Sequence, residues 1–294
     1  MQSAIELKNV TKKYKEFSIN ELSLSIPKGL ATVFIGNNGA GKTTLLKIMS
    51  QLITCEGEVF HDGAMVEEDD DSFKESMVYV PDSCCFPSFM DIKKVYELMK
   101  LGFHAFDESK FIKLCNEFEL IQENKLQSKK IKEMSTGNQM KLMLCAMLAR
   151  KGKYLLLDEP AANLDPVMQD LLQEKMRAYL MDEEHTIIYS THNIEQVNNV
   201  ADYVVFMKDG CILEQGLIDD VCGRYVIVQG NKKDQDTLKK RYLHMREHGE
   251  YVEGLMYKEE AQGLSKEMDI TIMKPDLREL SIFLLKKEPL CSQE

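Results

Sequence analysis

The sequence contains no tryptophan, only seven prolines in 294 residues, and no uninterrupted apolar run long enough to span a bilayer. Its first 25 residues mix charged with apolar side chains, which argues against a secretory signal peptide. The eight cysteines are scattered without Cys-x-x-Cys pairs, which argues against a zinc site and predicts reduced, structural thiols. With 44% hydrophobic residues, the chain is predicted to form one large or two smaller domains and to stay in the cytoplasm.

The chain also has fewer positively charged residues than negatively charged ones. The 37 Lys and Arg residues face 48 Asp and Glu residues, which leaves a net charge of −11. A surface that follows a phosphate backbone needs clustered Lys and Arg, so the composition argues against a nucleic-acid or anionic-membrane binder. The densest basic groups, at residues 129–132 and 239–241, are predicted to be solvated faces, and the acidic run at 67–71 a solvated loop.

The most informative motif is GNNGAGKTT at residues 36–44, between the apolar run ATVFI and the helix-like LLKIMSQL. Its glycines let successive backbone N–H groups face inward, and the following helix start adds the positive end of its dipole. Lys42 is predicted to reach the β- and γ-phosphates of a nucleoside triphosphate, and the Thr43 hydroxyl to bind Mg²⁺. The other predicted phosphate-lining residues are Asn37, Asn38, Gly39, Ala40, Gly41 and Thr44.

A second constellation, YLLLDEP at residues 154–160, ends an apolar strand in two carboxylates. Open α/β sheets bind their ligands at the carboxyl ends of the strands. Asp158 is therefore predicted to hold Mg²⁺ through its water shell, and Glu159 is the candidate general base for an attacking water. The alternative is a strand cap and turn without chemistry.

The remaining pattern predicts an α/β fold. Helices are predicted at residues 91–103, 107–121 and 137–150, with Asp91 and Asp107 as the N-caps of the first two. Apolar runs that alternate with helical stretches predict a buried parallel sheet; they lie at residues 154–158, 185–190 and 202–207.

Together, these motifs resemble the ATPase subunit of ABC transporters over roughly residues 5–223. GNNGAGKTT matches the Walker A motif of that family, YLLLDEP its Walker B motif, and MSTGNQ at 134–139 its signature loop. AANLD at 161–165 matches the segment that crosses the dimer interface, and STH at 190–192 the switch histidine. The resemblance implies a P-loop NTPase core: a parallel sheet, an antiparallel β subdomain and a helical subdomain at about residues 83–150.

The resemblance also implies roles for individual residues. Tyr14 would stack on adenine, and His192 would contact the γ-phosphate and help to hold the attacking water. Ser135 and Gly137 would present a helix start to the ATP of a second subunit, while Asp165 would link the two sites. Hydrolysis would then require two ATPase subunits, identical or different, that close around two ATP molecules and their Mg²⁺ ions.

The chain departs from the family pattern at two places. Asp82 stands where the family commonly has a Gln that reaches Mg²⁺ and water; Asp82 could bind the ion through a water, or the site could work less well. Thr136 and Asn138 replace the usual first Gly and the usual Gln of the signature loop. Because Lys42 and Glu159 are retained, the site is predicted to be hydrolytically competent.

The resemblance to the core ends at residue 223, and residues 224–294 predict a small α/β accessory domain. This domain is expected to pair with its counterpart across the dimer or to regulate closure. Its closing PDLRELSIFLL resembles the ending of ATPase subunits from bacterial exporters and peptide-resistance systems.

The implied function is ATP-driven export through a separate transmembrane permease subunit, with this chain bound peripherally at the cytoplasmic face of the membrane. The cargo would be an amphipathic or antimicrobial-type peptide or a lipid-like compound, and the permease would dock on the loop after Asp82 and the helices up to residue 106. One alternative is a soluble ABC-type ATPase that acts on ribosomes or DNA, although one phosphate loop and no sustained heptad occur here. Another is an ATP-binding regulator that hydrolyses little.

Overall fold

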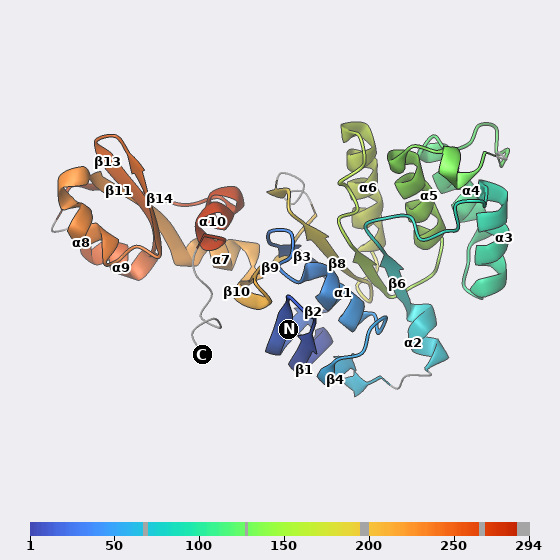
Figure 1. Cartoon of the computed structure of the whole chain (residues 1–294), viewed down its shortest axis with the longest axis horizontal. Coiled ribbons are helices and arrows are strands. Elements are labelled where there is room, and N and C mark those ends of the chain that lie inside the picture. Colours follow the sequence, from blue (N-terminus) through green and yellow to red (C-terminus); the bar gives the residue numbers. More distant parts are fainter. Residues whose placement is uncertain (67–69, 127–128, 195–199, 265–267, 287–294) are drawn as a thin grey trace.

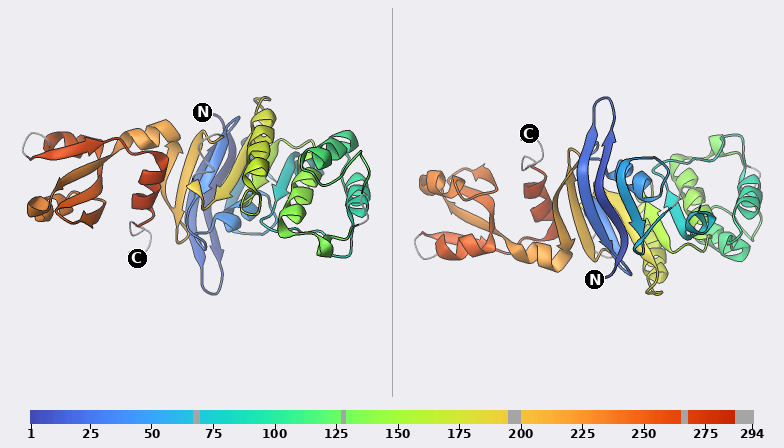
Figure 2. Two further views of the ribbon diagram at one scale, coloured as in Figure 1. Left: turned by 90° about the horizontal axis from the view of Figure 1, so that it is seen from above. Right: turned by 90° about the horizontal axis from the view of Figure 1, so that it is seen from below.

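The chain forms three sheets arranged along an elongated molecule (Figures 1 and 2). The computed structural model describes residues 1–66, 70–126, 129–194, 200–264 and 268–286. The C-terminal sheet lies at one end of the long axis, and a group of helices, α3 to α5, lies at the other (Figure 1). Within the described ranges, no helix is both long and apolar enough to cross a bilayer.

The N-terminal sheet is antiparallel and has four strands in the order β2-β1-β4-β5. Its strands are β1 (Ser3–Lys13), β2 (Ser18–Pro27), β4 (Glu56–His61) and β5 (Ala64–Met65). Buried residues alternate with exposed ones along much of β2, as expected for a sheet with one face against the core and one in water. The buried face packs with Leu45, Leu46 and Met49 of α1 (Lys42–Met49) in one hydrophobic cluster.

The central sheet has six strands in the order β10-β9-β3-β8-β7-β6. They are β3 (Ala31–Ile35), β6 (Met77–Val80), β7 (Tyr154–Leu157), β8 (Thr186–Thr191), β9 (Tyr203–Lys208) and β10 (Cys211–Leu217). All pairs are parallel except β9 with β10. Because Ile35 pairs with Thr191 and Leu157 with Tyr189, the loops that follow β3, β7 and β8 meet at one edge of the sheet.

Helices cover the central sheet and extend it at one side. The helices beside the core are α1, α2 (Asp71–Ser76) and α6 (Pro166–Tyr179), and the helical subdomain contains α3 (Ile92–Gly102), α4 (Glu108–Glu117) and α5 (Thr136–Leu148). The predicted N-caps are confirmed, because Asp91 accepts a hydrogen bond from Lys94 N and Asp107 accepts one from Lys110 N, both at 2.9 Å. All residues of α5 from Met140 onward are buried.

The structure corrects two expectations from the sequence, one about the acidic run at residues 67–71 and one about the cysteines. In the acidic run, residues 67–69 lie outside the described residues, but Asp70 caps α2 by accepting hydrogen bonds from Ser72 N at 2.9 Å and Phe73 N at 3.1 Å. The end of that run is therefore a helix start and not a loop. The expectation of reduced thiols is wrong for Cys211, which is disulfide-bonded. Among the described residues, the free cysteines are Cys55, Cys84, Cys85, Cys115, Cys145 and Cys222.

The C-terminal segment builds a third sheet, with the strand order β12-β13-β11-β14. Its elements are α7 (Ile218–Arg224), β11 (Tyr225–Asn231), α8 (Gln235–Lys239), β12 (His244–His248), β13 (Tyr251–Tyr257), α9 (Lys258–Leu264), β14 (Ile270–Met273) and α10 (Leu277–Leu284). Val228 and Met256 pack with residues of α8 and α9, while Ile227 and Leu255 share a cluster with α7 and α10. The sequence predicted an α/β segment but not β12, and the boundary at residue 223 stays a prediction.

His61 at the end of β4 gives the fold a testable dependence on pH. The side chain is 6% exposed and its ring lies against those of Phe73 and Tyr154, at centroid distances of 4.5 and 5.3 Å. Burial lowers its pKa to about 4, although the Met49 backbone and Asp62 act in the opposite direction. Because the unfolded chain takes up this proton near its ordinary pKa of 6.5, stability is lost as the pH falls from 6.5 to 4.

We expect His61→Phe to reduce that pH-dependent loss by up to about 3 kcal/mol. The measurement is urea unfolding at several pH values between 4 and 7. The exposed His248 provides the control substitution, His248→Phe, which should leave the pH profile unchanged. Equal profiles for wild type and His61→Phe would contradict the assignment.

Candidate functional site

The predicted phosphate loop joins β3 to α1 at the carboxyl edge of the central sheet. Gly41 has a left-handed φ of 105°, and a Cβ at Gly36 would lie 2.4 Å from the Met207 carbonyl oxygen. The turn after β9 braces the loop, because Gly210 N donates to Ala40 O at 3.0 Å. As N-cap, Gly41 has no side chain to satisfy the first N–H groups of α1, so these donors remain available to an anion.

Lys42 is buried at the first position of α1 and its ammonium lies over the loop. Its Nζ donates to Gly36 O at 2.7 Å and Asn37 O at 3.3 Å, and lies 3.5 Å from Glu159 Oε1. Asn37, Asn38 and Gly39 form the exposed tip of the loop, whereas Thr43 and Thr44 are half-buried in the first turn of the helix. The ammonium therefore lies between the loop carbonyls and the predicted catalytic carboxylate.

Asp158 follows β7 directly and is fully buried, so its carboxylate depends on hydrogen bonds. It accepts hydrogen bonds from Ser190 Oγ at 2.6 Å and from Tyr79 OH at 3.4 Å. Burial, followed by the charge of Asp158, raises the pKa of Tyr79 above its ordinary value, so this phenol stays a donor. Ser190 also accepts a hydrogen bond from Glu159 N at 2.9 Å and thus orients both predicted carboxylates.

Glu159 and His192 are in direct contact. His192 Nδ1 lies 2.7 Å from Glu159 Oε2, and His192 N donates to the same oxygen at 3.3 Å. Glu159 has a left-handed φ of 47°, a conformation that costs energy for a non-glycine residue and that clusters at functional sites. Together with Lys42, these side chains form a row of ammonium, carboxylate and imidazole at the sheet edge.

The predicted Mg²⁺ ligands are Thr43, Asp158 and Asp82. No group of three His, Cys, Asp or Glu side chains in the described ranges could hold a metal by itself. The donor set nevertheless fits Mg²⁺, which usually keeps waters and takes one or two carboxylates plus substrate phosphates. Asp158 offers a buried carboxylate, and Thr43 offers a hydroxyl in the first turn after the phosphate loop.

Asp82 lies two residues beyond β6, the strand that pairs with β7. Its side chain is exposed and accepts a hydrogen bond from Ser83 Oγ at 3.2 Å. Its charge contributes to the raised pKa of Tyr79, after burial and Asp158. The structure therefore brings Asp82 into the electrostatic environment of the site, and a role in metal binding stays a prediction.

The signature loop starts α5, where Ser135 is the N-cap and accepts a hydrogen bond from Asn138 N at 3.3 Å. A Cβ at Gly137 would lie 2.8 Å from Asn163 O, so the start of α5 lies against the segment before α6. Among the described residues, neither Ser135 nor Gly137 makes a hydrogen bond or ion pair with the loop at residues 36–41. Their predicted role therefore needs a second chain.

Asp165 is the N-cap of α6 and accepts a hydrogen bond from Met168 N at 3.1 Å. Its other carboxylate oxygen lies 3.8 Å from Nζ of Lys141, a mostly buried lysine on α5. This ion pair ties the signature helix to the predicted interface segment within one chain.

Tyr14 is 49% exposed, which leaves its ring accessible for the predicted stacking on adenine. Its ring centroid lies 6.4 Å from that of Phe17, and Lys12 Nζ lies 5.9 Å from it. Phe17, not Tyr14, is the side chain that lies against the loop, because a Cβ at Gly41 would be 2.7 Å from its ring.

Reasoning from the sequence missed Tyr79, Phe17 and the role of Lys141. Tyr79 and Phe17 reach the site only through the strand packing, so no local pattern marks them. For Lys141 a signal was available: it lies four residues after Gly137, hence on the same face of the helix.

A model of the ABC transporter family matches residues 19–162, which include both the phosphate loop and the carboxylate pair. The chain contains an ABC-type ATP-binding domain. It is 31% identical over 222 residues to the carnitine transport ATP-binding protein OpuCA of Listeria monocytogenes, covering 74% of this chain and 56% of that protein. It is 30% identical over 218 residues to the Fe(3+) ions import ATP-binding protein FbpC of Photorhabdus laumondii, covering 73% and 62% respectively.

The chain thus spans about three fifths of the length of these curated relatives. A solved dimeric ATP-binding cassette bound to ADP and phosphate superposes with a TM-score of 0.63 at 23% identity, over 72% of this chain and 98% of that one. This likeness confirms the fold of the ABC-type domain. His192, Asp165 and Tyr14 lie outside the residues that the family model matches, so their roles rest on geometry and motif order.

We expect Ser190→Ala to destabilise the ABC-type domain by about 1–3 kcal/mol, because it leaves a buried carboxylate and the Glu159 N–H with one partner fewer. The free energy of unfolding in urea measures this loss. Ser83→Ala is the matched control, since it removes an exposed hydroxyl that bonds only to Asp82 in the described structure. A change below about 0.5 kcal/mol for Ser190→Ala would contradict the role of this hydroxyl.

Proposed function

We propose that this chain is the ATP-hydrolysing subunit of an ABC transporter, bound through a separate permease to the cytoplasmic face of a membrane. The observation that carries the proposal is the row formed by Lys42, Glu159 and His192 at the carboxyl edge of the sheet. This row lies beside a helix start whose first N–H groups have no side-chain cap and are available to phosphates. A structural ion pair alone would not need the strained backbone at Glu159.

Each residue of the row has a task in hydrolysis. Lys42 releases its loop carbonyls and binds the terminal phosphates. Glu159 accepts a proton from the attacking water, and His192, held by Glu159, lies where it can contact the γ-phosphate. Thr43 and Asp158 would hold Mg²⁺ together with the phosphates, and the ion would supply positive charge to the transferred group.

A second ATPase chain completes the proposed site. Ser135 and Gly137 of one chain offer a helix start to the nucleotide held by the loop of the other. The pairing of Lys141 with Asp165 keeps that helix start aligned with the segment before α6. Two identical chains or two different chains could form such a dimer, and the proposal includes both.

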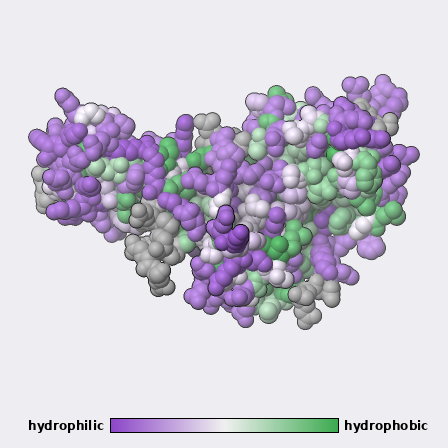
Figure 3. All heavy atoms as spheres, in the orientation of Figure 1, coloured by the Kyte–Doolittle hydropathy of each residue, from purple (hydrophilic) through white to green (hydrophobic). Residues whose placement is uncertain are grey.

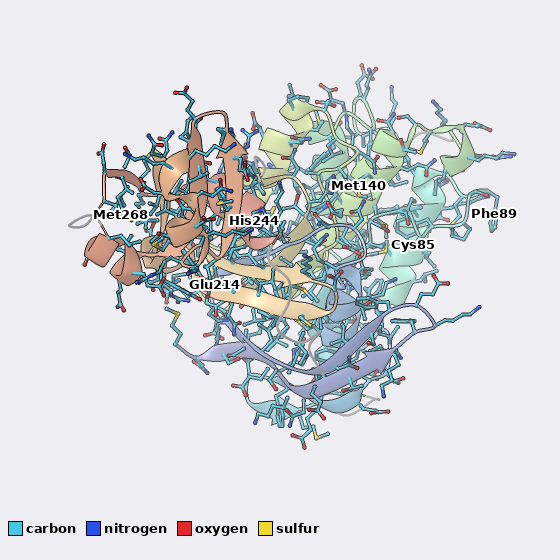
Figure 4. The ribbon with its side chains drawn as sticks, turned by 60° about the vertical axis from the view of Figure 1, so that its left-hand side comes forward. Cys85, Phe89, Met140, Glu214, His244 and Met268 are labelled. Atoms are coloured by element: carbon cyan, nitrogen blue, oxygen red, sulfur yellow. The ribbon has the colours of Figure 1, made fainter. Side chains whose placement is uncertain are left out.

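The proposed docking surface for the permease is a cavity of about 550 Å³ between the core and the helical subdomain. Its lining joins core residues such as Leu52, Phe73 and Tyr79 with Phe103 and Met143 of the helical subdomain. Cys85 lies at this junction and Phe89 farther out on the helical side (Figure 4), where apolar residues also gather on the surface (Figure 3). An apolar hollow at the junction of core and helical subdomain suits a short helix from a membrane partner.

Two other functions are less well supported. A ribosome- or DNA-acting ATPase would need a basic surface, whereas the chain has a net charge of −11. An ATP-binding regulator would not need Glu159 within hydrogen-bond distance of His192.

Only the C-terminal resemblance supports export of a peptide or lipid-like cargo, while the names of OpuCA and FbpC refer to transport and import of small solutes or ions. Cargo flux in liposomes that hold the whole complex would decide the direction.

We expect Glu159→Gln to lower ATP turnover at least about a hundred-fold, because it removes the base but keeps the shape of the side chain. Turnover is measured by phosphate release from the assembled complex, and nucleotide binding by the fluorescence of trinitrophenyl-ATP. Binding should persist. The exposed Glu174 supplies the control, Glu174→Gln, which should change neither. Unchanged turnover in Glu159→Gln would refute the hydrolytic role.

We expect Leu52→Glu to weaken association with the permease at least about ten-fold, because it places a charge on the rim of an apolar docking cavity. The measurement is co-purification of a tagged chain with membrane proteins from solubilised membranes of the native host. Met65→Glu is the control, since Met65 on β5 is similarly exposed, 62% against 58% for Leu52, and lies outside the cavity lining. Equal recovery with both variants would place the docking surface elsewhere.

A further inference from the structure

A second, larger cavity of about 980 Å³ lies at the opposite end of the central sheet from the nucleotide site. Its lining includes Ser76 and Lys153, which directly precede β6 and β7, whereas the phosphate loop and Asp158 follow the other ends of their strands. Lys110 and Leu114 enter from α4 of the helical subdomain. The cavity therefore spans the junction between the helical subdomain and the core, away from the ATP chemistry.

Three carboxylates line this cavity, and each lies near a basic group of the protein; Glu75 lies near Arg150, whose pKa its charge raises against the effect of burial. Glu184 pairs with Lys28 at 2.6 Å and with Lys153 at 3.4 Å. Asp182 accepts a hydrogen bond from Glu184 N at 3.0 Å and faces His185 at 3.8 Å. These acids therefore leave little negative charge to balance further cations.

Two surface-exposed lysines at the cavity, Lys110 and Lys151, have no ion-pair partner among the described residues. Partial desolvation of its ammonium lowers the pKa of Lys110, and the charge of Lys151 lowers it further, while Asp107 acts in the opposite direction. The Asp107 carboxylate is already engaged as a helix cap with Lys110 N at 2.9 Å. Arg150, also in the lining, is 94% buried, donates to Lys74 O at 2.9 Å and lies near Glu75. Lys110 and Lys151 are therefore the cations of the described lining that have no ion-pair partner.

Apolar side chains form much of the remaining wall. Leu114 and Leu148 are almost fully buried in the cavity wall, at 3% and 4% exposure. Tyr179 directs its hydroxyl to Gly152 O at 2.6 Å, which leaves the ring as an apolar wall. Met181 is 84% exposed and contributes a flexible apolar side chain. Small-molecule sites have this composition: a mostly apolar wall with a few convergent polar groups, in a volume of roughly 300–1,000 Å³.

We propose that this cavity is a binding site for an amphiphilic anion, a molecule with an apolar body and a single phosphate, sulfonate or carboxylate head. The head lies between Lys110 and Lys151, and the body lies against Leu114, Leu148 and Met181. Because the site is built from both the helical subdomain and the core, an occupant holds the two in one relative position. The site lies away from the residues proposed for ATP hydrolysis, whereas Arg150 lines both this cavity and the proposed docking cavity.

The test measures binding of octyl phosphate to the full-length chain by isothermal titration calorimetry below the micelle concentration. We expect saturable binding with one site per chain, and no comparable binding of inorganic phosphate, which lacks the body, or of octyltrimethylammonium, which reverses the charge. Equal binding of octyltrimethylammonium, or no saturable binding of octyl phosphate, would overturn the proposal.

Substitutions in the cavity lining test whether octyl phosphate binds at this site. Lys110→Gln combined with Lys151→Gln should weaken octyl phosphate at least about ten-fold, because it removes both charged contacts to the head. The control is Lys113→Gln combined with Lys132→Gln, two exposed lysines outside the cavity lining, and it should bind as wild type does. Met181→Glu, at an exposed position, should weaken binding without affecting the fold. Equal affinity of wild type and Lys110→Gln/Lys151→Gln would overturn the proposal.

A competition experiment distinguishes a membrane lipid from a soluble metabolite as the natural ligand. Vesicles of phosphatidylglycerol compete with octyl phosphate if the natural ligand is a membrane lipid, whereas soluble short-chain acyl phosphates alone compete if it is a metabolite. Competition by either ligand supports the same site. Neither ligand should compete in this way in the Lys110→Gln/Lys151→Gln variant.

Discussion

The buried carboxylate of Asp158 is the constraint on which the rest of the site depends. An ionised group with no exposed surface is tolerated only where other groups donate to it, and Ser190 and Tyr79 do so from the neighbouring strands. The same Ser190 hydroxyl accepts the Glu159 amide, so the backbone turns there into the left-handed region. That turn directs the Glu159 carboxylate toward Lys42 and His192. The order of strands β6, β7 and β8 is thus a requirement of the chemistry as well as of the core.

Residues that lie within a motif could be predicted from the sequence, because the motif itself fixes their geometry. The phosphate loop, Asp158, Glu159 and His192 belong to this group, and so do Asp91 and Asp107, whose side chains cap the helices that directly follow them. The residues that could not be predicted come from other strands. Tyr79 meets Asp158 only because β6 pairs with β7, and Phe17 meets the loop only because the N-terminal sheet packs there. Local patterns contain no information about such pairings.

The helical subdomain is coupled to the core at two distinct places. At the edge that holds the nucleotide site, the close approach of Gly137 to Asn163 O and the pair of Lys141 with Asp165 tie α5 to the start of α6. At the other end, Arg150, which follows α5, donates to Lys74 O of α2 at 2.9 Å. A rotation of the subdomain must therefore act on both ends of α5, which makes this helix the mechanical link between the proposed signature contact and the two cavities.

The C-terminal sheet is attached to the core by more than a linker. One hydrophobic cluster joins Val204 and Phe206 of β9 to Leu280 and Phe283 of α10. Glu214 on β10 pairs with Arg224 at 2.6 Å, and in Figure 4 both Glu214 and His244 lie where this sheet meets the core. Removing the segment after residue 224 would expose that cluster beside β9, whose following turn braces the phosphate loop through Gly210. A truncation would therefore disturb the nucleotide site by unpacking the core, and point substitutions on the exposed face of the third sheet are the sounder way to probe its role.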